Sequence, residues 1–165
     1  MKNFKKSVLK GIVLVLLVLC ITVTWFVLEI LLPHRTLSSP DWWIPIGEGK
    51  YAPNRKTRNA CHAVLRYQFT YHNDAVLALR YVGDKDSIPY LIQALKLQNV
   101  KHPSAITSDK RAPVTFMRCL GSLEQLTGMK LGRDYKTWEN WWKETGQYLP
   151  FDEEKGQLIL QEGTE

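Results

Sequence analysis

The chain has 165 residues, of which 45% are hydrophobic and 23% are charged. These fractions are those of globular proteins, which excludes a wholly disordered chain, a collagen-like chain and a membrane protein with many spans. The net charge is +6, and half of it comes from residues 1–32, where four lysines accompany one glutamate.

An uncharged apolar segment follows the basic N-terminus. Residues 11–28 read GIVLVLLVLCITVTWFVL, and a helix of this length measures about 27 Å, close to the hydrocarbon thickness of a bilayer. We therefore predict that residues 11–32 form an uncleaved transmembrane signal anchor. A cleaved secretory signal is the alternative, although such signals have an apolar region of about 7 to 15 residues that ends at a small-x-small motif. Trp25 and Glu29 are expected at the outer membrane interface.

The distribution of lysines predicts the orientation. Lysines that precede a span tend to stay in the cytoplasm, so the N-terminus is expected there and the C-terminal domain in the periplasm or outside the cell. The predicted organisation is a basic cytoplasmic leader at 1–10, the anchor at 11–32, a linker and lead-in rich in proline and glycine at 33–56, a helical domain at 57–148 and an acidic tail at 149–165. Trp42 and Trp43 in the linker are expected to cover one end of the domain core, and the alternatives are a place at the lipid interface or a platform on which a sugar or other ligand stacks.

Apolar residues at helical spacing predict the first helices of the domain. One helix is expected from Thr57 towards Tyr71, and a second begins at Asn73 and Asp74, whose side chains suit a helix N-cap. Gly83 is expected to end that helix in the left-handed conformation. The next helix begins at Asp84 or Asp86 and runs beyond Leu95. Because the intervening turn is short, the last two helices are expected to pack antiparallel.

A polar stretch, residues 98–112, is predicted to be a long loop. Its basic residues are candidates for contact with a partner, because loops held by a rigid scaffold often carry function; they are Lys101, His102, Lys110 and Arg111. A further helix is expected over 116–126 with Gly128 at its end. Asp134 then caps a final helix, in which Trp138, Trp141 and Trp142 share one face and cover the core. The tail is expected to add a short strand or docking segment.

Two segments resemble a known repeat family. Residues 74–96, DAVLALRYVGDKDSIPYLIQALK, resemble a HEAT-type repeat, and residues 119–146, CLGSLEQLTGMKLGRDYKTWENWWKETG, are similar to the closing segment of many bacterial HEAT-repeat proteins. The resemblance implies an all-α fold, a short α-α superhelix of HEAT-like helix pairs, that binds another protein noncovalently and has no enzymatic activity. An enzyme or enzyme subunit of the HEAT-like lyase type, which assists cofactor attachment, is the alternative, and a purely structural tether is a third.

The sequence shows none of the common motifs for catalysis, metal binding or nucleotide binding. The four histidines are scattered, without the paired spacing of zinc ligands, and the sequence has neither a phosphate-binding glycine motif nor a serine-hydrolase elbow. We expect no metal, cofactor, small-molecule substrate or nucleic acid; the expected partners are the membrane and an unidentified protein. Cys61 and Cys119 lie on apolar helix faces. They are expected to be two buried small hydrophobic residues, and the alternatives are a disulfide between two helices or a reactive thiol.

Overall fold

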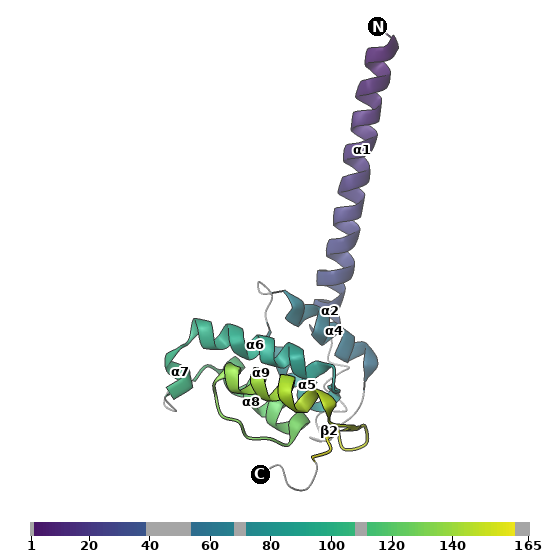
Figure 1. The fold of residues 1–165 in the computed structure, drawn as a ribbon. Helices are drawn as coiled ribbons and strands as arrows, with labels where there is room; N and C mark the ends of the chain where they lie inside the picture. The colour runs from purple at the N-terminus through teal and green to yellow at the C-terminus, as the bar shows by residue number, and fades with distance from the viewer. Residues whose placement is uncertain (1, 39–53, 68–71, 108–111, 161–165) are drawn as a thin grey trace.

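Helices dominate the computed structural model, which describes residues 2–38, 54–67, 72–107 and 112–160. Figure 1 shows a long N-terminal helix that projects from a body of packed helices. The elements are α1 (Lys2–Phe26), the π-helix η1 (Val27–Leu31), α2 (Leu32–Ser38), α4 (Arg55–Arg66), α5 (Asn73–Val82), α6 (Ser87–Lys101), α7 (Ser104–Thr107), α8 (Val114–Thr127), α9 (Tyr135–Glu144), the 3-10 helix η4 (Gly146–Tyr148), β1 (Phe151–Asp152) and β2 (Gln157–Leu158).

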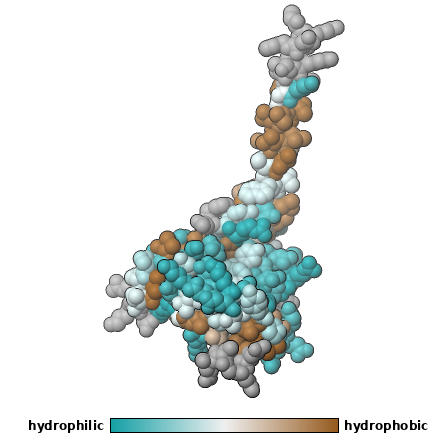
Figure 2. Space-filling model, viewed as in Figure 1, coloured by the Kyte–Doolittle hydropathy of each residue, from teal (hydrophilic) through white to brown (hydrophobic). Residues whose placement is uncertain are grey.

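The projecting helix is long and apolar enough to cross a membrane. The candidate span is Lys10–Leu37, and an 18-residue window within it has a mean hydropathy of 2.9 and is not covered by the rest of the chain. Figure 2 shows this part as a hydrophobic band above a mostly hydrophilic body. The helical segment also extends six residues beyond the predicted end of the anchor at residue 32, so the first residues of the predicted linker are helical. Trp42 and Trp43 lie outside the described residues.

The body is built around α4, α5, α6, α8 and α9. Helix α5 packs against α4 and α8, while α6 packs against α4, α8 and α9. The predicted antiparallel pairing of α5 with α6 is not the main packing, because these two helices contact each other far less than each contacts α4 and α8. The buried hydrophobic residues of the five helices form one core with Leu37 of α2; the most enclosed large members are Trp138, Phe116, Leu65, Leu79, Ile88, Leu91, Leu95, Leu123 and Leu126.

Two predicted helix ends are confirmed, and two, at Asn73 and Gly83, are wrong. Gly128 ends α8 with a φ of 71°, in the left-handed conformation, and the Asp134 side chain accepts a hydrogen bond from the Lys136 amide at 3.0 Å, capping α9. Asn73 does not cap α5. The helix begins at that residue, and its side-chain oxygen instead accepts a hydrogen bond from Thr115 of α8 at 3.3 Å.

The predicted long loop is shorter and partly helical. Helix α6 continues to Lys101, and α7 follows three residues later. The reason is Asn99, which is buried although it is polar. Its side chain donates to the Arg133 carbonyl at 3.2 Å and accepts from the Tyr135 amide at 2.8 Å, so a tertiary contact with the start of α9 satisfies its amide group and holds the last turn of α6.

The C-terminal segment adds a small hairpin. Strands β1 and β2 pair antiparallel, with Phe151 opposite Leu158. Leu149 and Leu158 are buried in the core, and the Leu149 carbonyl accepts a hydrogen bond from Lys85 at 2.6 Å. The predicted short strand is therefore confirmed, and this part of the predicted tail belongs to the folded body.

The role of Gly83 differs from the prediction. Its backbone is extended, with φ −67° and ψ 165°, rather than left-handed. Glycine is required here by space, because an added Cβ would meet the Leu79 carbonyl oxygen and would lie 2.9 Å from Leu126 Cδ1. The backbone of the α5–α6 turn thus lies directly against α8.

We predict opposite effects for two glycine-to-alanine substitutions. Gly83→Ala should lower the free energy of unfolding by about 1 to 3 kcal/mol, because the new methyl group overpacks the turn. Gly121→Ala, within α8, should raise it by about 0.5 to 1 kcal/mol, because the nearest atom to an added Cβ is Arg80 Nη1 at an ordinary 3.7 Å. Urea unfolding of the full chain in detergent micelles measures both. Equal destabilisation by the two variants would contradict the packing at Gly83.

The three tryptophans of α9 should differ in their contributions. Trp138 is fully buried, its indole N–H donates to the Gly132 carbonyl at 2.8 Å, and its ring meets Trp141 edge-on at 6.2 Å. Trp138→Ala should therefore cost about 3 to 5 kcal/mol. Trp142 is only partly buried against the core, so Trp142→Ala should cost clearly less in the same unfolding experiment. A larger loss for Trp142→Ala would contradict this assignment.

Candidate functional site

Helix α4 connects the projecting helix with the body, and three sides of it make different contacts. Its core side, which includes Cys61, Val64 and Leu65, is buried. A second side, with Arg58 and His62 one turn apart, is bonded to the α5–α6 turn. The third side, with Asn59, Ala63 and Arg66, lies beside η1 and α2. Because the residues of each side are spaced three or four apart along the chain, one short helix can contact all three neighbours at once.

Polar and aromatic contacts join α4 to the projecting helix. Arg66 forms an ion pair with Glu29 at 3.0 Å, and the Tyr67 hydroxyl donates to the same carboxylate oxygen at 3.4 Å. The Tyr67 ring also meets Trp25 edge-on at 5.8 Å. The predicted interfacial pair Trp25 and Glu29 therefore contacts the domain itself, a role that single-sequence reasoning did not identify because the partners are about forty residues away.

A proline explains the π-helical turn at this junction. Proline has no N–H, and within an α-helix its ring would clash with the carbonyl four residues earlier, which for Pro33 is the carbonyl of Glu29. Here the Leu32 amide bonds to the Val27 carbonyl five residues back, so the turn before Pro33 is widened. The helix then continues into α2, whose Leu37 is buried in the core. The widened turn thus lets the chain pass Pro33 without ending the helix.

An open pocket of about 320 Å³ lies between the projecting helix and α4. Aliphatic and polar side chains both line it. The lining residues are Leu28, Glu29, Leu32, Pro33 and Thr36 from the projecting helix and Asn59, Ala60, Ala63 and Arg66 from α4. The Arg66 and Glu29 side chains are 52% and 35% exposed, so both charges of the ion pair remain accessible to a ligand.

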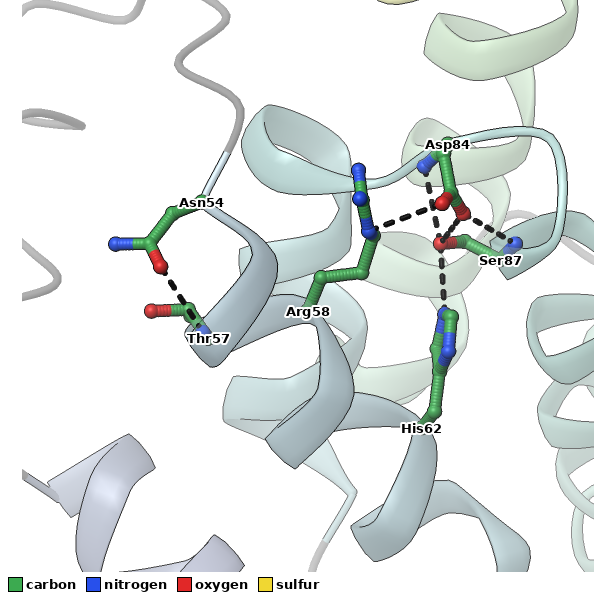
Figure 3. Close-up of polar contacts among 6 residues, drawn as sticks. All are labelled: Asn54, Thr57, Arg58, His62, Asp84 and Ser87. Atoms are coloured by element: carbon green, nitrogen blue, oxygen red, sulfur yellow. Dashed lines mark hydrogen bonds and ion pairs between the residues drawn. The ribbon is translucent and has the colours of Figure 1, made fainter.

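A polar network holds the second side of α4 to the α5–α6 turn (Figure 3). The Asp84 carboxylate accepts hydrogen bonds from the Ser87 amide at 3.0 Å and from the Ser87 hydroxyl at 2.8 Å, and so caps α6. Its other oxygen pairs with Arg58 Nε at 3.0 Å. His62 Nε2 lies 2.8 Å from Ser87 Oγ, and the imidazole stacks on the Tyr90 ring at 4.4 Å.

Serine, histidine and aspartate are the residue types of a nucleophilic triad, but their arrangement here is different. The Ser87 hydroxyl donates its proton to Asp84 and accepts from the Asp84 amide at 3.0 Å. His62 must therefore donate through Nε2–H, so it cannot take the serine proton as a general base. Ser87 is also completely buried. The network caps a helix and fastens α4 to the body.

The sequence candidates for partner contact are not gathered at this junction. Lys101 and His102 are exposed at the end of α6, on a different element from the pocket. Lys110 and Arg111 lie outside the described residues.

Cys61 and Cys119 are both free, buried thiols. This arrangement is the one expected if they act as two small hydrophobic residues. Burial raises the pKa of each thiol, and the Cys119 thiol donates to the Leu91 carbonyl at 3.1 Å. Both cysteines thus stay protonated and poorly nucleophilic. Among the described residues, no group of three or more His, Cys, Asp or Glu side chains is placed to hold a metal ion.

One half-buried and one buried histidine predict a loss of stability in mild acid. Burial lowers the pKa of His62, an effect that the Asp84 charge partly opposes, and burial also lowers the pKa of His72, whose Nε2–H donates to the Tyr67 carbonyl at 2.7 Å. The unfolded chain then takes up protons at a higher pH than the folded chain. Stability should be constant above the ordinary value of 6.5 and should fall as the pH decreases below it.

Melting temperatures of the full chain between pH 8 and pH 5 test this prediction. His62→Gln keeps a side-chain donor for Ser87 and removes the titrating group, so its melting temperature should depend less on pH than that of the wild type. His102→Gln, at an exposed position, is the matched control and should keep the wild-type profile. Identical profiles for His62→Gln and the wild type would contradict the assignment.

No family model, curated protein or solved structure matches this chain.

Proposed function

We propose that the protein is a single-span membrane protein whose helical domain is a noncovalent scaffold for another protein at the cell envelope. The observation that carries this proposal is the continuity of the uncovered apolar helix with α2, which packs on α4. An apolar helix of this length is stable in a lipid bilayer and would be unfavourable in water. Its direct packing on the body would hold the domain close to the membrane surface.

The charge distribution supports an exported domain. Four lysines lie within the first ten residues, and lysines flanking a first span favour the cytoplasmic side. We therefore place the N-terminus in the cytoplasm and the body in the periplasm or outside the cell. Glu29 and Trp25, at the opposite end of the apolar helix, then lie at the outer interface, where a carboxylate and an indole are readily accommodated.

The stacking order of the helices supports the HEAT-like interpretation. In such repeats, the first helices of successive pairs are neighbours, and so are the second helices. Helix α5 packs against α8, and α6 against α9, as expected between two successive pairs α5–α6 and α8–α9, whereas the helices within each pair make little contact and α6 also packs against α8. Helix α4 covers the start of the stack, and the hairpin of β1 and β2 contacts α8.

Exposed apolar side chains mark the part of the body that we propose as the protein-binding surface. Val114 and Met117 are 64% and 46% exposed and lie one turn apart on α8, so the two side chains are neighbours on the surface. Exposed apolar patches rimmed by polar residues often mark protein interaction sites. The guanidinium of Arg133 lies 3.9 Å from the Met117 sulfur and supplies a polar edge.

A single introduced cysteine tests orientation and binding together. The native thiols outside the apolar helix are buried, so Met117→Cys provides the accessible thiol for a membrane-impermeant, photoactivatable reagent applied to intact cells. We expect labelling, followed after illumination by a discrete crosslinked product of higher mass. Lys136→Cys, exposed on α9, is the control and should be labelled without forming that product.

The outcomes separate the two parts of the proposal. Absence of labelling at both positions in intact cells, with labelling after the membrane is opened, would contradict the exported orientation. If both variants are labelled but Met117→Cys gives no discrete crosslinked product, the proposed scaffold function is contradicted. The wild-type chain, which lacks an accessible thiol on the described part of the body, shows the background.

A further inference from the structure

We propose that the pocket between the projecting helix and α4 binds the headgroup of a phospholipid that carries a primary ammonium group. This inference rests on the membrane insertion proposed above and adds a specific lipid ligand to it. The pocket is lined by Glu29 and Thr36 on one side and by Asn59 and Arg66 on the other, over a floor of aliphatic side chains.

The position of the pocket along the helix matches the headgroup layer. The apolar segment begins at Lys10, and Glu29 lies nineteen residues further on, which is about 28 Å along a helix. The hydrocarbon core of a bilayer is about 30 Å thick. If Lys10 lies at one interface, Glu29 and the pocket therefore lie at the other, where phosphate and ammonium groups are present.

The charges of the pocket complement a zwitterion. Arg66 presents a guanidinium that suits a phosphate, and Glu29 presents a carboxylate that suits an ammonium group. The two charges sum to zero, as do those of a phosphate and an ammonium. A headgroup with net negative charge would gain the Arg66 contact but would also meet the Glu29 carboxylate, so it fits less well.

The chemistry of the lining distinguishes an ammonium headgroup from a choline headgroup. A primary ammonium has three N–H donors, and the Glu29 carboxylate, the Thr36 hydroxyl and the Asn59 amide oxygen are acceptors. Choline has no N–H and is typically recognised by aromatic side chains. None of the described residues that line the pocket is aromatic, although Tyr67 and Trp25 lie beside the Glu29 carboxylate, so the hydrogen-bond acceptors carry the distinction.

The size of the pocket suits a headgroup better than a whole lipid. Small-molecule sites usually measure about 300 to 1,000 Å³, and this one is at the lower end of that range at about 320 Å³. The aliphatic wall, formed by Leu28, Leu32 and Ala63 among others, leaves a surface for the upper part of an acyl chain. The headgroup would thus be held in the pocket while the chains stay in the bilayer.

Photolabelling in vesicles tests the proposal. The full chain is reconstituted in phosphatidylcholine vesicles containing a trace of photoactivatable phosphatidylethanolamine, phosphatidylcholine or phosphatidylglycerol, each with the same reactive group near the glycerol. Labelled peptides are identified by mass spectrometry, and labelling of residues 28–36 and 59–66 is divided by labelling of residues 12–20, which contact bulk lipid. We expect this ratio to be about fivefold higher for the ethanolamine probe than for the other two.

Three variants identify the groups responsible. Arg66→Gln should lower the ratio for the ethanolamine probe to the value expected for contact with bulk lipid alone, because the partner of the phosphate is lost. Glu29→Gln should remove the preference for ethanolamine over choline. Lys56→Gln removes an exposed positive charge from the same helix, outside the pocket lining, and should leave the wild-type ratios unchanged.

The results that overturn the inference differ from those that overturn the anchor. Equal ratios for the three probes, a highest ratio for phosphatidylglycerol, or an unchanged ratio in Arg66→Gln would each refute the lipid site while the chain remains a membrane protein. Release of the chain from all vesicles by alkaline carbonate would refute the membrane anchor, and the headgroup site with it.

Discussion

The packing of α4 against three neighbours is the constraint on which the rest of the structure depends. Burial of Cys61, Val64 and Leu65 joins this helix to the core, while its other sides contact the α5–α6 turn and the base of the projecting helix. Apolar burial stabilises the helix by about 25 cal/mol per Å² removed from water, before any polar contact is counted. The polar contacts then determine how α4 is oriented between the anchor and the body.

The two polar clusters of α4 differ in burial, and this difference separates their roles. Ser87 is fully enclosed, and its hydroxyl uses its one donor and both acceptor positions within the network. Such a satisfied group favours one arrangement, since any alternative would leave a buried polar atom unpaired. The pair of Arg66 and Glu29 is partly exposed. Exposed ion pairs contribute little to stability, about 0 to 1 kcal/mol. A ligand that separates the two charges would therefore cost the fold little.

The proposed activities follow from the same arrangement. If the projecting helix crosses the membrane, α4 packs beside its outer end, and the pocket lies between the two. The apolar patch of Val114 and Met117 lies on α8, a different helix. We therefore propose two independent surfaces, one for a lipid headgroup and one for a protein, connected through the buried core that α4, α5 and α8 share.

The sequence by itself determined the helices and the apolar span, because hydrophobic periodicity, capping residues and segment length are local properties; the left-handed Gly128 and the Asp134 cap were correct for this reason. Only the tertiary structure decided which helices are neighbours, that the helix passes Pro33, that Gly83 is required by the approach of Leu126, and that Asn99 is buried. The candidate site was not predictable either. Its two walls, around Glu29 and Arg66, are separated by more than thirty residues, and such a meeting arises from long-range packing rather than from any pattern within one segment.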